Sequence, residues 1–322
     1  MRISLLDRSR VRTGESDADA VQATVSRAKK ADALGFHRFW TAEHHAVPGI
    51  ASASPSVLLS AIGAHTRCIR LGTGGIMVPN HSPMVIAEQA LLLEALYPGR
   101  VDLGLGGSLG FTPAIRRALG RTVLQDDEYA AEVEKVGSFL GSSAELTIRP
   151  HVSPPPMFLL AIKGGLSLAA QLGLPVVVGG PLLQDPTAIR SYFTNFQCNA
   201  TGTDPYLIVS VDIAIAQTAD RARELLLPEA WAFADSRDIG EFRALRPVED
   251  VQRMLHDESS AKKHAAVHGW ADAAISGDPG DVRRSLDDLV ARTGAAEVMA
   301  SVSTYDRGEV DRIDEALAAF HS

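Results

Sequence analysis

The sequence has few cysteines, few aromatic residues and no excess of positive charge, and each shortage narrows the class of protein. Only Cys68 and Cys198 occur among 322 residues, so no disulfide framework is implied and a reducing compartment fits. The formal net charge is −8, from 31 basic and 39 acidic residues, which argues against a general nucleic-acid surface. Aromatic residues make up 6% of the chain, too few to indicate a ligand by stacking.

Long apolar runs are also absent, and no segment reaches the length of a membrane span. The first six residues enter a strand-like run without the basic-then-apolar layout of a signal peptide. We therefore predict a cytoplasmic protein with no membrane partner. Hydrophobic residues still make up 46% of the chain, enough for a large buried core.

Strand-like and helix-like segments alternate from start to end. Expected strands are 3–6, 37–41, 69–74, 101–105, 158–161, 176–178, 207–216 and 297–301, with a possible short extra strand at 145–149. Expected helices are 17–34, 55–65, 83–96, 128–140, 166–172, 188–196, 282–291 and 310–320. This alternation predicts an α/β fold, a (β/α)8 TIM barrel forming one domain over residues 1–322. A doubly wound open sheet is the alternative. Residues 228–277 carry helical patterns but no strand, and we interpret them as an insertion after the seventh strand.

The strongest chemical signal follows the second expected strand, where Glu43, His44 and His45 end an apolar run. In a TIM barrel the carboxyl ends of the strands carry the active site. We predict these three as catalytic residues, with one of the two histidines as an acid–base or hydrogen-bonding group. A histidine that only packs beneath a loop is the alternative. No metal site is expected, because His264 and His268 lack the following Glu of the zinc-protease pattern.

Glycine-rich exits from the third and fourth strands form a second signal. Thr73-Gly74-Gly75 and Gly104-Leu105-Gly106-Gly107-Ser108 allow a backbone to approach a flat ligand closely, although a tight exit turn explains them too. The second run fails the dinucleotide pattern because Leu109 stands where a glycine is needed, so a nicotinamide site is disfavoured.

A lysine and two glycines, Lys163-Gly164-Gly165, precede the expected helix at 166–172. Free backbone N–H groups at a helix start, with a lysine nearby, would bind a phosphate. A plain turn between strand and helix remains the other interpretation of this segment.

The sequence resembles the bacterial luciferase-like flavin monooxygenases, in particular single-chain members often found in antibiotic and other secondary-metabolite pathways. The resemblance is carried by Trp40-Thr-Ala-Glu43-His44-His45, by Arg70-Leu-Gly-Thr-Gly-Gly-Ile-Met-Val-Pro-Asn80-His81-Ser-Pro83 and by Gly99-Arg100-Val-Asp-Leu-Gly104. It spans nearly the whole chain and is densest from Phe36 to Gly107.

The resemblance implies a barrel that binds reduced FMN, supplied by a separate flavin reductase. Flavin and O2 would form a C4a-hydroperoxide that oxygenates a small organic substrate such as a polyketide. His44 would be the catalytic histidine, a cis peptide would join Gly74 to Gly75, and the protein would be a homodimer. Cofactor contacts are expected at Leu6, Thr73, Gly74, Gly75, Gly104, Gly106, Ser108, Lys163, Gly164 and Gly165. Gly107 departs from the family, whose members often carry a phosphate-binding arginine there, and Lys163 is a candidate replacement.

Three alternatives to this function stay open. An F420-dependent oxidoreductase of the same superfamily would need no oxygen, and a flavin-binding protein without catalysis would form no product. A metal-dependent barrel hydrolase would need more ligands at the strand ends than Glu43, His44 and His45 provide. The substrate itself is not readable, because the loops that shape such a pocket follow no recognisable motif.

Overall fold

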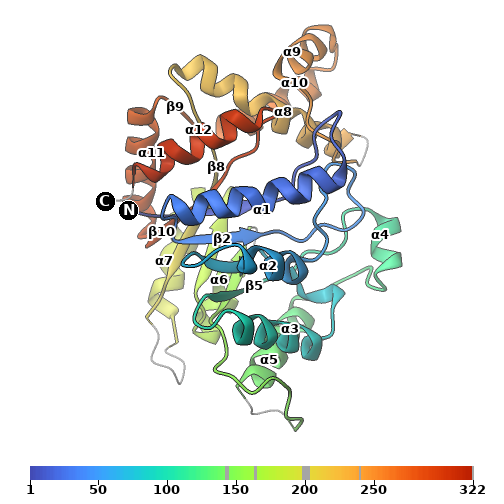
Figure 1. The fold of residues 1–322 in the computed structure, drawn as a ribbon, viewed down its shortest axis with the longest axis vertical. Helices are drawn as coiled ribbons and strands as arrows, with labels where there is room; N and C mark the ends of the chain where they lie inside the picture. The colour runs from blue at the N-terminus through green and yellow to red at the C-terminus, as the bar shows by residue number, and fades with distance from the viewer. Residues whose placement is uncertain (142–144, 163–164, 198–203, 239–240, 321–322) are drawn as a thin grey trace.

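The computed structural model describes residues 1–141, 145–162, 165–197, 204–238 and 241–320. Its centre is a closed barrel of parallel strands surrounded by helices (Figure 1). The barrel strands are β1 (Arg2–Asp7), β2 (Arg38–Thr41), β3 (Arg70–Thr73), β5 (Val101–Gly106), β6 (Met157–Ala161), β7 (Val176–Gly179), β8 (Leu207–Ile215) and β10 (Glu297–Ser301). The ring closes because β10 pairs with both β8 and β1. The predicted eight-stranded TIM barrel is confirmed.

The helices lie outside the barrel, and local sequence sets several of their boundaries. They are α1 (Asp17–Ala33), α2 (Pro55–Ala64), α3 (Pro83–Leu96), α4 (Pro113–Ala118), α5 (Asp126–Leu140), α6 (Leu166–Leu172), α7 (Pro186–Asn195), α8 (Ala219–Asp238), α9 (Val248–Asp257), α10 (Ala261–Ala273), α11 (Pro279–Thr293) and α12 (Arg307–Ala318), with 3-10 turns η1 (Val78–Asn80) and η2 (Gly180–Gln184). A capping box of Ser16 and Asp19 begins α1, and Gly294, with a φ of 67°, ends α11. Within the described ranges, no helix has the length and apolar character needed to cross a bilayer.

Three details differ from the prediction. Residues 145–149 form no strand, because only Ile148 among them is buried and the segment has no apolar face to add to a sheet. The insertion after the seventh barrel strand is present, but the expected start at Pro228 lies inside α8, which begins nine residues earlier in sequence at Ala219. The insertion also contains a strand, β9 (Ile275–Gly277), which pairs with the end of β8. The assignment of residues 1–322 to a single domain stays a prediction.

The insertion has a small core of its own. Trp231 of α8, Val251 of α9 and Val267 of α10 pack together, separate from the main core. Helices α9 and α10 project at one end of the molecule, in orange in Figure 1. The apolar faces of the three helices are therefore buried largely against each other.

The barrel interior is filled by a few large side chains. Trp40 and Phe158 meet edge-to-face, with ring centroids 5.3 Å apart, and pack with Ile208 and Met299. Gly72 is needed beside them, since a Cβ there would lie 1.9 Å from Trp40 Nε1. The strands thus enclose a packed core, so a ligand site has to lie at an end of the barrel.

The amino end of the barrel is closed by a buried ionic network. Arg38 lies 2.6 Å from an Asp102 oxygen and 3.1 Å from a Glu297 oxygen. The Tyr206 hydroxyl donates to Glu297 at 2.7 Å, and the Trp40 indole N–H donates to Asp102 at 3.3 Å. Every charge in this layer has an opposite charge in contact, as burial requires.

Candidate functional site

A cavity of about 610 Å³ lies at the carboxyl ends of the strands. Its walls come from the segments after β2, β5 and β6, from the β3–β4 region and from α5, where β4 is Ile76–Met77. The volume falls in the range of small-molecule sites, about 300–1,000 Å³. The sequence-predicted residues that line it are Glu43, His44, His45, Gly74, Gly75, Gly106, Ser108 and Gly165. The structure therefore brings most of the candidate residues to one place.

Three candidate residues lie outside the cavity lining, and two lie outside the described residues. Thr73 Oγ1 accepts the Gly104 N–H at 2.8 Å and donates to the Gly104 carbonyl at 2.7 Å, so this pair joins β3 to β5 below the cavity. Leu6 packs close to Gly74. Lys163 and Gly164 are the two that the structure does not describe.

The cavity floor is backbone without side chains. The Gly74–Gly75 peptide between β3 and β4 is cis, as the resemblance implied. A Cβ on Gly74 would lie 2.5 Å from Leu6 Cδ1, and one on Gly75 would lie 3.0 Å from the Gly104 carbonyl oxygen. At Gly106, by contrast, the nearest atom to an added Cβ is the Ile76 carbonyl oxygen at 3.7 Å. The Gly106 backbone therefore borders open space, which suits the face of a planar ring.

His44 stands on one wall of the cavity. Its backbone N–H donates to the Ser52 carbonyl at 3.1 Å, which fixes the loop after β2. Its Nδ1 is buried and has no hydrogen-bond partner among the described residues. Burial, together with the positive charges of Arg8 and Arg10, lowers the pKa of His44 to about 4. The imidazole is therefore neutral at physiological pH and keeps one ring nitrogen free.

The charged residues near His44 come from the loop after β1, from β8 and from the insertion. Arg8 contacts Asp212 at 2.7 Å and Glu229 at 3.0 Å, and Arg10 contacts the other Glu229 oxygen at 2.8 Å. Arg10 also donates to the Gly49 carbonyl and, at 3.2 Å, to the Arg243 carbonyl. The sequence analysis missed these residues. Arginines at alternate positions directly after the first strand were the available signal.

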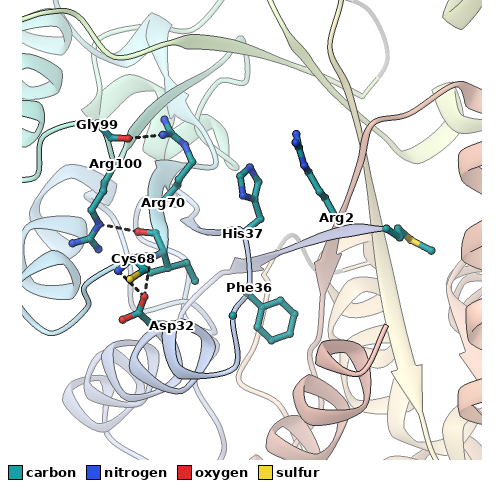
Figure 2. A pocket seen from close by; sticks show the side chains of 11 residues that line it. Arg2, Asp32, Phe36, His37, Cys68, Arg70, Gly99 and Arg100 are labelled. Carbon is teal, nitrogen blue, oxygen red and sulfur yellow. Dashed lines mark hydrogen bonds between the residues drawn. The ribbon is translucent and has the colours of Figure 1, made fainter. Parts of the chain in front are cut away.

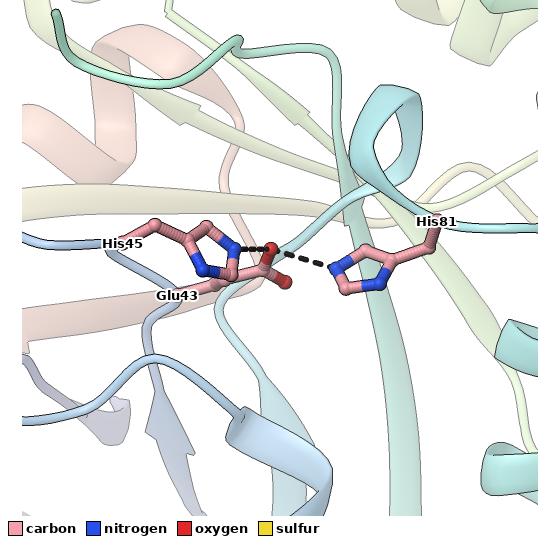
Figure 3. Close-up of side chains that lie close together, drawn as sticks. All are labelled: Glu43, His45 and His81. Atoms are coloured by element: carbon pink, nitrogen blue, oxygen red, sulfur yellow. Dashed lines mark hydrogen bonds and ion pairs between the residues drawn. The ribbon is translucent and has the colours of Figure 1, made fainter. Parts of the chain in front are cut away.

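The Glu43 carboxylate joins two other histidines, His45 and His81 (Figure 3). His45 Nε2 and His81 Nε2 approach the same oxygen, Glu43 Oε1, at 2.6 and 2.8 Å, while the Met77 N–H donates to Oε2 at 3.1 Å. Burial alone would raise the pKa of Glu43, but the hydrogen bonds from His81 and His45 hold it below its usual value. The hydrogen bond to Glu43 raises the pKa of His81. His81, which follows η1, is a second residue that the sequence analysis did not single out.

The loop after β5 forms another wall of the cavity. At Gly107, an added Cβ would lie 3.3 Å from the Tyr129 ring, which lines the cavity. Arg116 Nε donates to the Gly110 carbonyl at 2.7 Å, so one face of this guanidinium holds the loop. Ser108 is a polar residue of this loop that lines the cavity.

A second cavity, of about 810 Å³, lies at the amino ends of the strands (Figure 2). Arg2, His37, Arg70 and Arg100 line it, and the donors of Arg70 and Arg100 are already used. Arg70 binds Asp102 at 2.6 Å, and Arg100 donates to the Ile69 and Thr66 carbonyls at 3.0 Å. We assign this cavity to the structural end of the barrel, where side chains serve stability.

Solved structures share this architecture. The structure of apo-MsnO8 aligns with a TM-score of 0.88 and 26% identity, covering 99% of this chain and 98% of that one. Two more distant structures show likeness in fold alone. One is the oxygenating constituent of 3,6-diketocamphane monooxygenase from Pseudomonas putida in complex with FMN (TM-score 0.74, 17% identity, 99% and 96% covered). The other is an F420-dependent secondary alcohol dehydrogenase (TM-score 0.68, 15% identity, 100% and 99% covered).

Sequence comparison is more specific. The family model described as luciferase-like monooxygenase matches residues 1–297. A luciferase-like monooxygenase of Escherichia coli is 35% identical over 314 residues, covering 94% of this chain and 92% of the relative. The N-acetyl-S-alkylcysteine monooxygenase of Bacillus subtilis is 40% identical over 191 residues, covering 55% and 56%. This chain belongs to the luciferase-like monooxygenase family of oxidoreductases.

Proposed function

We propose that this protein is a monooxygenase that uses reduced FMN and O2 to oxygenate a small organic substrate. The observation that carries the proposal is a cavity with a glycine floor and, on its wall, a histidine that stays neutral and has a free ring nitrogen. Bound FMN would supply the oxygen chemistry. The protein residues would bind it, exclude water and manage protons.

The floor is the proposed seat of the flavin ring. The Gly74–Gly75 segment and Gly106 present backbone to the cavity, and the space beside Gly106 is what a side chain would otherwise fill. The phosphate would be held by Ser108 and the backbone of its loop, with Lys163 and Gly164 as further candidates from the sequence. The fold likeness to an FMN complex supports this choice of cofactor.

His44 is the proposed proton-handling residue. His44 lines the cavity, and its low pKa keeps the imidazole neutral and able to accept a proton or a hydrogen bond across neutral pH. Leu109, Phe111 and Leu160 give the cavity apolar walls, which would keep water from the reacting atoms. We propose that Glu43 and His45 support the loop that carries His44 and touch no reacting atom.

The substrate is proposed by class only. A secondary metabolite such as a polyketide remains the candidate from the sequence. The relative named N-acetyl-S-alkylcysteine monooxygenase adds thioethers as a second candidate. An F420-dependent oxidoreductase is the alternative reaction, supported by the fold likeness to an F420 enzyme. A flavin carrier without catalysis is the other alternative.

A homodimer and a separate flavin reductase complete the proposal, together with a cytoplasmic location. Four apolar side chains on the outer faces of α2 and α3 are exposed: Val57, Val85, Leu92 and Leu96. Such a patch on a surface helix pair is typical of a subunit interface. Size-exclusion chromatography with light scattering tests the dimer, and Leu92→Glu should shift it to monomer.

The experiment that tests the function is an anaerobic titration with reduced FMN followed by a pulse of oxygen. We expect saturable binding, then a flavin absorbance transient distinct from the reduced and oxidised forms, which is shortened in His44→Ala. Binding followed by direct oxidation would favour the F420 enzyme or the flavin carrier, and turnover with reduced F420 under anaerobic conditions separates these two. No binding of reduced FMN would refute the cofactor assignment.

A further inference from the structure

We propose that Glu43, His45 and His81 form a binding site for a divalent transition metal of the Zn²⁺ class. The three side chains lie beside the cavity but are distinct from His44, and the proposed function does not use them for proton transfer. The inference departs from the expectation of a metal-free protein, which rested on too few ligands at the strand ends. His81 supplies the ligand that the sequence analysis lacked.

The first argument is charge. The Glu43 side chain is 1% exposed, and a carboxylate buried to this degree needs a positive partner. Within the described residues, its ion-pair partners are only the two imidazoles of His45 and His81. An imidazole supplies that positive charge only while it is protonated. A divalent cation between the three groups would supply that charge.

The second argument is geometry. One ligand atom from each residue lies within 4.8 Å of the others. In Figure 3 the two imidazoles face Glu43 from opposite sides. Tetrahedral ligands at zinc distances are separated by roughly 3.4 Å, so each Nε2 has to withdraw from Oε1 by less than about 1 Å, and the two nitrogens, which lie within 4.8 Å of each other, have to reach the same separation. The side chains of His45 and His81 are 18% and 32% exposed, which leaves room for this movement.

The third argument is support from neighbouring groups. The Met77 N–H holds Glu43 Oε2 at 3.1 Å and so directs Oε1 toward both histidines. Metal-binding carboxylates are commonly oriented by such a second hydrogen bond. The two imidazoles come from different loops, one after β2 and one after η1, so the bound ion would join two walls of the cavity.

The donor set indicates which metals fit. Two imidazole nitrogens and one carboxylate oxygen suit Zn²⁺ and Fe²⁺, whereas Ca²⁺ and Mg²⁺ prefer oxygen ligands. Three protein ligands leave at least one coordination position for water. Because Glu43, His45 and Met77 line the cavity, that position can open toward it.

The test is a Zn²⁺ titration of the full-length protein. The protein is first treated with a chelator, and binding is measured by isothermal titration calorimetry. Substitution with Co²⁺ gives a visible spectrum that reports the ligands. His81→Ala and His45→Ala remove one ligand each. His81→Gln keeps a hydrogen-bond donor for Glu43 but no imidazole, and His81→Cys restores a zinc ligand. The matched control is His264→Ala with His268→Ala on α10, a histidine pair with ring centroids 6.1 Å apart, against 6.2 Å for His45 and His81.

We expect one Zn²⁺ per chain, with an affinity that falls by about 100-fold or more in His81→Ala, His81→Gln and His45→Ala, since even losing an outer-shell partner costs 10–100-fold. His81→Cys should recover part of it, and the α10 variant should bind as the wild type does. Absence of wild-type binding, equal binding in His81→Gln, or loss only in the α10 variant would overturn the proposal. Reduced FMN binding, measured in the same samples, reports the proposed function separately.

Discussion

The two ends of this barrel both carry buried charges, yet they are built in opposite ways. At the amino end, Arg38 lies between Asp102 and Glu297, and each carboxylate has further donors. At the carboxyl end, His44 has a buried ring nitrogen with no partner in the described structure. The amino-end cavity is the larger of the two, about 810 Å³ against about 610 Å³. The volume of a cavity and the charges around it therefore do not tell which end holds the functional site. A buried polar atom without a hydrogen-bond partner does.

The largest expected effect on stability comes from breaking the ion pairs at the amino end of the barrel. Arg38→Met leaves Glu297 and part of Asp102 buried without its cation, and we expect a loss of about 3–5 kcal/mol in the free energy of unfolding. Urea denaturation followed by circular dichroism measures it. Flavin binding by the protein that remains folded should be unchanged. A loss below about 1 kcal/mol would show that the network is dispensable, and the contrast between the two ends would fail.

At the carboxyl end of the barrel we expect a loss of turnover and not of stability. His44→Ala should lower turnover by about 100-fold or more, in line with acid–base contributions, with little change in stability or in reduced FMN binding. Steady-state kinetics and flavin titration measure the two quantities. His45→Ala is the neighbouring control, because His45 is bonded to Glu43, and its effect on turnover should be much smaller. Equal turnover in His44→Ala and wild type would remove the proposed role.

A pair of glycines sharpens the comparison. Gly72→Ala forces a Cβ against the Trp40 ring and should cost about 1–3 kcal/mol of stability. Gly106→Ala places its Cβ in open space on the cavity floor, so stability should be retained while the flavin Kd rises by about tenfold or more. Thermal unfolding and flavin titration of both variants decide. Unchanged flavin affinity in Gly106→Ala would place the ring elsewhere.

The smallest expected effect is a shift in the pKa of His44. Arg10→Gln removes a positive charge near His44 and leaves Glu229 with Arg8 alone, so the pKa of His44 should rise from about 4 toward its ordinary value of 6.5. NMR of labelled histidine measures it. A depressed pKa also means that stability from neutral His44 is fully present above pH 6.5 and is lost as pH falls toward 4. In the variant, this acid-side loss should shrink. An unchanged pKa would show that burial and Arg8 lower it without a contribution from Arg10.

The barrel architecture could be predicted from the sequence because the patterns that indicate strands and helices are local. All eight barrel strands were expected within a few residues, and α3 and α6 at their observed bounds. The glycine exits and Glu43-His44-His45 were placed correctly at one end, since topology alone puts strand ends there. Thr73 and Gly104 were expected to touch a ligand but lie below the floor, bonded to each other.

Residues that meet only through tertiary pairing could not be expected. Glu229 reaches Arg8 and Arg10 from α8, more than two hundred positions along the chain. His81 joins Glu43 from another loop. The sequence gives no register between such segments. The short strands β4 and β9 could not be told from loops in the sequence. Each has at most three residues and forms by pairing with a longer strand.

The way the barrel closes has a consequence for the chain during synthesis. Strand β10 joins β1 to β8, so until residues 297–301 have left the ribosome, two neighbouring strands expose unpaired edges. Glu297, in the same five residues, also forms an ion pair with Arg38. This ion pair therefore cannot form before β10 is available. The edges of β1 and β8 therefore stay open to mispairing until β10 is available to pair with them.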